Sequence, residues 1–125
     1  MRYLGNKNKI AKHIVPIITK HLTTANQYIE PFCGALGMLS NVRHHDRWAF
    51  DKDKYIIALM KAVRDGWVPP SDISQETYDE VRKNKDNYPD CLVGFIGYGC
   101  SFGGKWFGGL ARSNDNRGNP RNMPA

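Results

Sequence analysis

The stretch Tyr28–Gly37 (YIEPFCGALG) constrains the fold more than any other part of the chain. It begins as a short strand and runs into a turn of small residues, which the apolar, helix-compatible run Met38–Val42 follows. Glycine lets the backbone approach a ligand closely, and the free amides at a helix start sit behind such a turn. The stretch therefore predicts a strand, a glycine turn and a helix that suit a nucleotide-like ligand. A glycine that serves only strand-turn-helix packing is the alternative.

A second strand-like run, Arg47–Phe50, ends in Asp51, about seventeen residues after Gly34. In a β-α-β unit, an acid at the end of the second strand can hold the hydroxyls of a ribose. Two interpretations of Asp51 stay open. It binds a ribose, or it caps the following helix, a role that Asp53 fills as well.

Apolar residues at helical spacing predict an amphipathic helix over residues 10–22, with its isoleucines in the core. Pro16 is expected to kink this helix or to divide it near His13–Val15. A second helix is predicted from Lys54 to about Asp65, because Gly66 is a natural stop.

The second half of the chain is predicted to be helical and rich in glycine. Residues 74–85 read as a polar surface helix with acids early and lysines late, which matches the helix dipole. A buried helix is predicted to start near Pro89, although several glycines in it lower the helix propensity. Close packing against another helix would justify those glycines. Residues 113–125 show no apolar pattern and are expected to be loop or disordered.

The charge and composition restrict the class of protein. A formal net charge of +6 favours an anionic partner, usually nucleic acid, although a merely basic surface is the alternative. Three cysteines without paired spacing favour a reducing cytoplasm. The chain has no signal core and no long apolar run, so no membrane partner is predicted. The adjacent His44 and His45 lack a carboxylate or cysteine at ligand spacing, so no metal is predicted.

Two loops carry a further signal. Ser101–Arg112 (SFGGKWFGGLAR) combines aromatic rings, glycines and two cations, a mixture that favours a nucleic-acid-facing loop. A tight aromatic mini-core with incidental charges is the alternative. Near the N-terminus, Arg2–Lys7 (RYLGNK) is a polar loop in which Lys7, taken alone, reads as a solvated lysine.

Taken in order, Arg2–Lys7, Tyr28–Gly37 and Gly99–Gly109 resemble the Dam-type, adenine-specific DNA methyltransferases, and the resemblance covers nearly all of the chain. It implies an α/β fold: part of the Rossmann-like sheet of S-adenosylmethionine-dependent methyltransferases, then the start of a helical target-recognition subdomain. It implies S-adenosylmethionine as the cofactor and double-stranded DNA as the partner. Residues 1–68 would form the cofactor-binding portion, and residues 69–125 the helical, glycine-rich start of the DNA target-recognition portion.

The resemblance also implies roles for single residues. The implied cofactor contacts are Tyr3, Gly5, Asn6, Lys7, Pro31, Phe32, Cys33, Gly34 and Asp51. The implied DNA contacts are Lys105, Arg112 and Asn114, the last two in an Arg-x-Asn element. Phe32 either packs against the electron-poor sulfonium or the adenine of the ligand, or it belongs to the core. Cys33 is read as a small packing residue, because transfer to an amine needs no covalent enzyme intermediate. Leu36 stands where some members carry glycine.

The family's catalytic Asp-Pro-Pro-Tyr motif is absent from these residues. The order of the other motifs would place it after residue 125, so the sequence is similar to the N-terminal portion of such an enzyme. We therefore expect no catalytic residue in this chain and no methyl transfer by it alone, and the missing C-terminal portion is a further expected partner. Two alternatives stay open: a non-catalytic remnant that binds nucleotide or DNA, and a defunct fragment that has no ligand.

Overall fold

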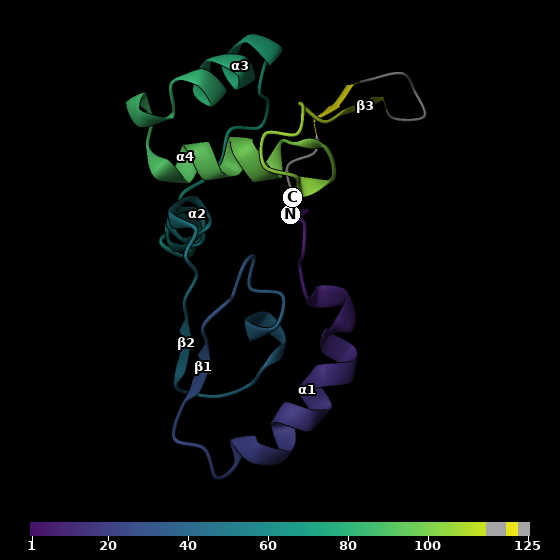
Figure 1. The fold of residues 1–125 in the computed structure, drawn as a ribbon, viewed down its shortest axis with the longest axis vertical. Helices are drawn as coiled ribbons and strands as arrows, with labels where there is room; N and C mark the ends of the chain where they lie inside the picture. The colour runs from purple at the N-terminus through teal and green to yellow at the C-terminus, as the bar shows by residue number, and fades with distance from the viewer. Residues whose placement is uncertain (115–119, 123–125) are drawn as a thin grey trace. The chain divides into compact units, whose positions relative to one another are not determined.

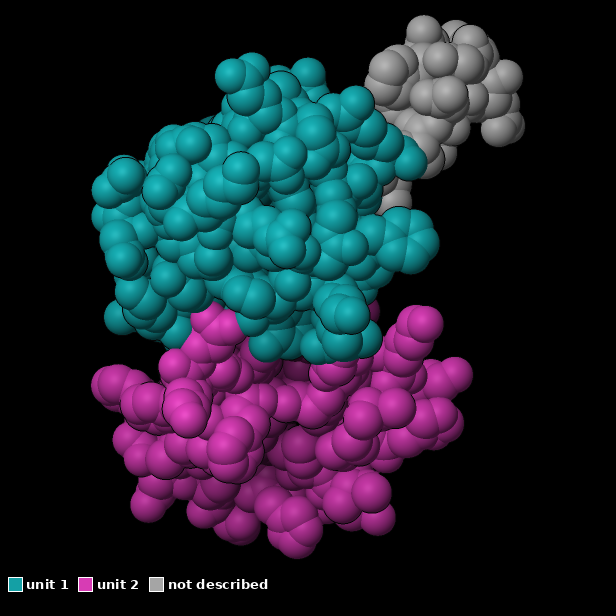
Figure 2. Space-filling model, turned by 45° about the horizontal axis from the view of Figure 1, so that its top comes forward, with its two compact units in different colours: residues 1–4, 54–125 teal, residues 5–53 magenta. Residues whose placement is uncertain are grey.

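The computed structural model describes residues 1–114 and 120–122 (Figure 1). In chain order, its elements are α1 (Asn8–Leu22), β1 (Tyr28–Glu30), η1 (Leu39–Asn41), β2 (Arg47–Ala49), α2 (Lys54–Arg64), α3 (Gln75–Lys83), η2 (Lys85–Asn87), α4 (Asp90–Gly94), η3 (Phe95–Gly99), η4 (Phe102–Gly104), β3 (Arg112–Asn114) and β4 (Pro120–Asn122). The chain packs as two compact units (Figure 2). The strand unit comprises residues 5–53, and the helical unit comprises residues 1–4 and 54–125.

The strand unit is built on β1 and β2, which pair in parallel with Ile29 opposite Trp48. Two further backbone bonds continue the pairing beyond the strands. The Phe50 amide donates to the Glu30 carbonyl, and the Cys33 amide donates to the Phe50 carbonyl, both at 2.8 Å. Both predicted strands are thus confirmed. Within the described residues these two strands form a two-stranded sheet. The fold therefore mixes helices and strands, and the Rossmann-like sheet stays a prediction.

The connection between β1 and β2 differs from the prediction, because the expected helix over Met38–Val42 is a single 3-10 turn, η1. The glycine turn already occupies the residues up to Gly37, and Val42 returns to an extended conformation. The segment left between them is too short for a stable α-helix, because the stability of an isolated helix is marginal below about twelve residues. In the strand unit η1 lies between the sheet and α1 (Figure 1). Arg47 donates to the carbonyls of Leu39 and Val42 at 3.1 and 2.9 Å.

Helix α1 runs unbroken from Asn8 to Leu22 with Pro16 inside it, so the predicted division did not occur. Proline removes one backbone bond from a helix, and the bonds of the remaining turns hold α1 together as one element. The isoleucine stripe was expected to be core, but Ile10 is 48% exposed and Ile17 is 60% exposed. Among the residues of α1 only Ala11 is buried. The apolar face of α1 is therefore covered only in part.

The helical unit is organised around α2 and α4, as Figure 1 shows. The end of α2 is confirmed, because Gly66 takes a positive φ of 93° just after the helix. The predicted polar helix is α3, which Ser74 caps by accepting the Thr77 amide at 3.0 Å. That helix is not wholly solvated, since its Tyr78 and Val81 are buried.

The predicted buried helix begins after Pro89 as α4 and continues as the π-helical turn η3. A Cβ on Gly94 would overlap the backbone carbonyl oxygen of Tyr55 on α2. A Cβ on Gly97 would overlap the indole of Trp106. Gly94 therefore allows the predicted close packing against another helix, whereas Gly97 allows packing against an aromatic ring of the following loop.

The C-terminal tail is ordered differently from the prediction. Residues 113–125 were expected to be loop or disordered, but β3 and β4 pair antiparallel, with Ser113 opposite Arg121. Strand pairing of this kind satisfies backbone donors and acceptors without an apolar side-chain pattern, and it therefore left no signal in the sequence. Residues 115–119 and 123–125 lie outside the described part of the chain.

Candidate functional site

The side chain of Asp51 links the ends of β1 and β2. One of its carboxylate oxygens accepts the Gly34 amide at 2.8 Å, and the other accepts the Asp53 amide at 2.9 Å. The second bond closes an Asx-type turn just before α2, so Asp51 supports the local backbone. A carboxylate has about four acceptor positions, so these two bonds leave acceptor capacity on Asp51. The ribose role of Asp51 stays a prediction, and the structure places the acid directly on the glycine turn.

The turn after β1 uses two residues in the left-handed region. Gly34 has φ 49°, and Leu36 has φ 62°. The first is the conformation that glycine adopts at no steric cost, whereas the second is unfavourable for leucine. The Leu36 amide donates to the Cys33 carbonyl at 2.8 Å, which closes the turn. Leu36 therefore has a backbone conformation that is typical of glycine.

Gly37 determines how closely the N-terminal loop approaches this turn. A Cβ at Gly37 would overlap the side-chain oxygen of Asn6 and would lie 2.7 Å from the backbone nitrogen of Asn8. The Asn6 oxygen also accepts the Asn8 amide at 3.0 Å, which shapes the loop at the start of α1. The side chain of Asn41 donates to the Gly37 carbonyl at 2.7 Å and to Asn8 Oδ1 at 3.1 Å. The predicted N-terminal loop and the glycine turn are thus packed together.

Lys7 lies over the end of β1. Its ammonium donates to the Phe32 carbonyl and forms an ion pair with Glu30 Oε1 at 3.2 Å. The Lys7 side chain is one-third exposed, whereas the Glu30 side chain is 8% exposed. The simple solvated-lysine interpretation is therefore wrong, because Lys7 is tied to the glycine-turn strand. Its contact with a cofactor stays a prediction.

Glu30 is the residue of this site that the sequence analysis did not select. It is buried, and among the described residues neither of its carboxylate oxygens has a partner in hydrogen-bonding geometry, although the Lys7 charge is close. Burying a carboxylate is costly unless it is paired, and the ion pair with Lys7 supplies the opposite charge. Burial, and after it the negative charge of Glu30, raise the pKa of Tyr28 on the same strand. An acid at the last position of a strand, just before a glycine turn, was the available sequence signal.

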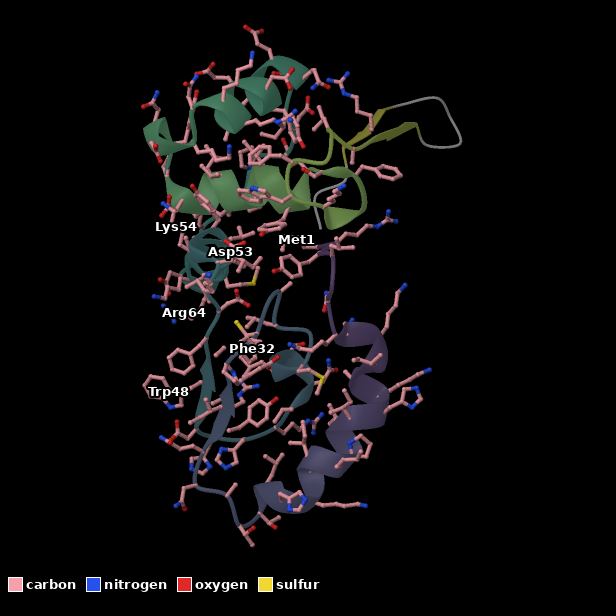
Figure 3. All side chains as sticks on the ribbon, in the orientation of Figure 1. Met1, Phe32, Trp48, Asp53, Lys54 and Arg64 are labelled. Carbon is pink, nitrogen blue, oxygen red and sulfur yellow. The ribbon has the colours of Figure 1, made fainter. Side chains whose placement is uncertain are left out.

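Cys33 is buried, whereas its neighbours Pro31 and Phe32 are exposed. Phe32 is 77% exposed, so the core interpretation of this ring is wrong and its packing against a ligand stays a prediction. Figure 3 labels Phe32 within the strand unit. Cys33 is 1% exposed, and burial is the main cause that raises the pKa of its thiol, followed by the charges of Asp51 and Glu30. A buried thiol with a raised pKa is a packing residue. Pro31 is exposed.

The other predicted cofactor contacts divide between the two units. Gly5, with φ 85° and nothing near its Cβ position, belongs to the strand unit with Asn6 and Lys7. Tyr3 belongs to the helical unit, where its ring packs on Tyr98 with centroids 4.9 Å apart. The structure therefore brings together the contacts of the strand unit and assigns Tyr3 to a separate packing cluster.

The predicted DNA contacts belong to the helical unit. Lys105 and Arg112 are exposed, and Arg112 begins β3. Asn114 ends β3, and the description does not extend to its side chain. In the same loop Trp106 is half-buried and Phe107 is buried. Two rings therefore belong to an aromatic core, whereas the cations face solvent and their contact with DNA stays a prediction.

Over residues 1–114 and 120–122, no helix combines the length and apolar character needed to cross a membrane. Within the same part of the chain, no group of three His, Cys, Asp or Glu side chains is arranged to hold a metal ion.

Comparison with known proteins gives one match. Residues 3–95, more than half of the chain, match the family described as D12 class N6 adenine-specific DNA methyltransferase. No curated protein and no solved structure matches the chain.

Proposed function

The chain belongs to the D12 class N6 adenine-specific DNA methyltransferases, and from that premise we propose that its strand unit binds S-adenosylmethionine and its helical unit binds DNA. The family is one of DNA-modifying transferases. The finer assignments, which are the cofactor, the DNA surface and the exocyclic amine of adenine as the methyl acceptor, are our proposal. The cofactor and the DNA surface rest on the contacts described above, and the methyl acceptor rests on the description of the family.

One observation carries the cofactor half of the proposal: the bond between the Asp51 carboxylate and the Gly34 amide. It fixes an acid beside a glycine turn at the carboxyl ends of two parallel strands. In open α/β sheets, ligands bind outside the carboxyl ends of the strands. A nucleoside with a ribose diol matches an acid in this place.

The residues around that bond fit the rest of S-adenosylmethionine. Glu30 is a buried carboxylate whose Oε1 faces the Lys7 ammonium at 3.2 Å, and its other oxygen would accept the ammonium of the methionine end. Lys7 adds a cation for the methionine carboxylate. The exposed ring of Phe32 suits an electron-poor sulfonium. Asp51 would take the ribose hydroxyls.

When bound, S-adenosylmethionine supplies an electrophilic methyl group. The residues of this chain would bind and orient that cofactor, and in-line positioning is a large part of catalysis in such a transfer. The acceptor adenine must also leave the duplex stack, which costs a few kcal/mol. These 125 residues contain no Asp-Pro-Pro-Tyr, so we propose that this chain alone binds its ligands without transferring a methyl group. Transfer of labelled methyl to adenine-containing DNA above background would contradict that part.

Isothermal titration of the folded chain with S-adenosylmethionine tests the cofactor half. We expect saturable binding with one cofactor per chain. A chain with intact circular dichroism and no heat of binding would contradict it.

The proposed DNA binding rests on two exposed cations, one in the loop after η3 and one at the start of β3. Lys105 and Arg112 both lie in the helical unit, and neither has an ion-pair partner among the described residues. Exposed cations beside a glycine-rich turn match phosphates, which supply most of the affinity in protein–DNA binding. Asn114, next along β3, is proposed as a third contact.

We predict that Lys105→Ala and Arg112→Ala weaken DNA binding uniformly across sequences. Each substitution should lower the slope of log affinity against log salt by about one, because one phosphate contact releases roughly one counterion. Fluorescence anisotropy of a labelled duplex at several salt concentrations measures the slope. Lys83→Ala, an exposed cation on α3, is the matched control and should bind as the parent chain does. Unchanged slopes in both loop variants would contradict the proposal.

A further inference from the structure

The loop Ser101–Arg112 holds three aromatic rings, and the structure separates them by role. Trp106 packs between Tyr98 and Tyr55, with centroid distances of 4.6 and 5.1 Å. Phe107 is 8% exposed and packs edge-on against Tyr78 at 5.4 Å. Phe102 is 73% exposed and takes part in none of these ring pairs. Only Phe102, of the three, presents its ring to solvent.

The backbone around Phe102 is held in place on both sides. The Phe102 amide donates to the Gly109 carbonyl at 2.8 Å, and the Gly104 amide donates to the Ser101 carbonyl at 3.0 Å. Ser101 is buried, and its hydroxyl lies 2.7 Å from the Tyr78 hydroxyl. The exposed ring therefore stands on a fixed turn.

Two glycines make this turn tight enough to expose the ring. Gly103 and Gly104 have φ values of 64° and 71°, which other residues rarely adopt. A Cβ on Gly104 would lie 2.5 Å from the Arg2 carbonyl oxygen, and the Leu4 amide donates to the Gly104 carbonyl at 3.2 Å. The turn is thus pressed against the N-terminal segment of the same unit. A ring displayed on a preorganised turn loses little conformational entropy when it binds.

Three cations belong to the turn that carries Phe102 or to the backbone segments that contact this turn. Arg2, Lys105 and Arg112 are all exposed. Arg2 abuts Gly104, and Arg112 follows Ala111, whose amide donates to the Cys100 carbonyl at 2.8 Å. The turn and the two segments that it contacts, residues 1–4 and 109–112, carry cations and no acid.

We propose that Phe102 stacks on a nucleobase of a bound DNA strand while the neighbouring cations hold its phosphates. This proposal rests on the proposed DNA binding and adds a base contact to it. A single planar ring among cations matches nucleic acid, since aromatic rings stack on bases and cations hold the backbone. An apolar protein partner would call for a wider apolar patch around the ring.

The test compares Phe102→Ala, Phe102→Leu and Phe102→Trp in anisotropy titrations with a labelled single strand and a duplex that contains one mismatch. Leucine keeps an apolar side chain without a π face, whereas tryptophan enlarges the π face. We expect alanine and leucine to lose about five- to a hundredfold in affinity with an unchanged salt slope, and tryptophan to retain affinity. The additional indole of Phe102→Trp should be quenched by DNA, measured against the parent chain. Val68→Ala, at an apolar side chain that is 82% exposed, is the control and should change nothing.

The outcomes separate this inference from the proposed function. Parent-like affinity in Phe102→Ala, together with a lower salt slope in Arg112→Ala, would overturn the stacking role and leave DNA binding intact. Parent-like affinity in Phe102→Leu alone would overturn stacking in favour of a general apolar contact. Absence of DNA binding by the folded parent chain would overturn both proposals.

Discussion

Leu36 holds a left-handed backbone conformation, φ 62°, inside the turn that carries Gly34. For a residue with a Cβ this conformation costs about 1–2 kcal/mol. The side chain is half-buried, so part of that cost is offset by its packing. The residue therefore combines backbone strain with apolar contact at the centre of the candidate cofactor site.

We predict that Leu36→Gly is more stable than Leu36→Ala by about 1 kcal/mol. Both variants lose the leucine side chain, and only glycine removes the strain. This order is the reverse of the usual one, in which alanine is the more stable residue. Urea unfolding of the two variants measures the difference. A more stable alanine variant would mean that residue 36 does not have positive φ in solution.

At the scale of elements, the contact between α2 and α4 depends on Gly94. Its α-carbon faces the Tyr55 carbonyl so closely that a Cβ would overlap the oxygen and lie 3.0 Å from the carbonyl carbon. Both atoms belong to the backbone of α2, which cannot rotate away as a side chain can. The two helices can therefore approach this closely because residue 94 has no side chain.

We predict that Gly94→Ala destabilises the helical unit by about 2 kcal/mol or more, although alanine favours a helix by about 1 kcal/mol. Gly99→Ala is the matched control. A Cβ there would meet only side-chain atoms of Phe95 and Met1, at 3.2–3.5 Å. Thermal unfolding followed by circular dichroism compares the two. Equal melting temperatures would show that α4 does not pack against α2 as described.

The same scale shows where sequence patterns were sufficient. The strands around Ile29 and Trp48 and the end of α2 before Gly66 followed from alternation, apolar runs and turn residues. The helix expected over Met38–Val42 failed because the preceding turn used the residues that a first helical turn needs. The hairpin of β3 and β4 could not be predicted, since backbone pairing carried it without an apolar pattern.

The candidate site was predictable to a different degree. The contact between Gly34 and Asp51 agrees with strand spacing, because both lie at the carboxyl ends of paired strands. The burial of Glu30 and the packing of the Tyr3 ring on Tyr98 depend on tertiary packing, which no local pattern encodes. Only the structure could show which ring of the loop Ser101–Arg112 faces solvent.

At the scale of the whole molecule, the accessibility of the three cysteine thiols measures how well each unit is packed. Cys33 in the strand unit and Cys100 in the helical unit are buried, whereas Cys91 is half-buried. Burial is the main cause that raises the pKa of the Cys100 thiol to about 11, with the Asp72 charge second. The thiolate is the reactive form, so both buried cysteines should be inert near neutral pH.

We predict that a thiol reagent labels Cys91 first, and labels Cys33 and Cys100 only after denaturation. Mass spectrometry of peptides from a time course identifies the order. Because the folded-state pKa of Cys100 is raised, its contribution to stability is complete below the ordinary thiol pKa and is lost as the pH rises toward about 11. Cys100→Ala should therefore flatten the alkaline loss of stability. Rapid labelling of Cys33 in the native chain would show that the strand unit does not pack as described.

The strand unit also exposes a considerable amount of apolar surface. Ile29, Trp48 and Phe50 are each about half exposed. Parallel strands are normally covered on both faces, so this surface makes the unit marginal by itself. Trp48, labelled in Figure 3, is an exposed aromatic residue of the strand unit outside the candidate site. It can therefore serve as the control for Phe32, which is exposed in the same unit and belongs to the site.

The most direct test of the cofactor site is the S-adenosylmethionine titration repeated on three variants. We predict that Asp51→Ala abolishes binding, Phe32→Ala weakens it about fivefold, and Trp48→Ala leaves it unchanged. Circular dichroism of each variant shows that it is folded, which matters most for Asp51 because its carboxylate also holds two amides. Equal weakening by Phe32→Ala and Trp48→Ala, or full binding by folded Asp51→Ala, would contradict the assignment of the cofactor to this turn.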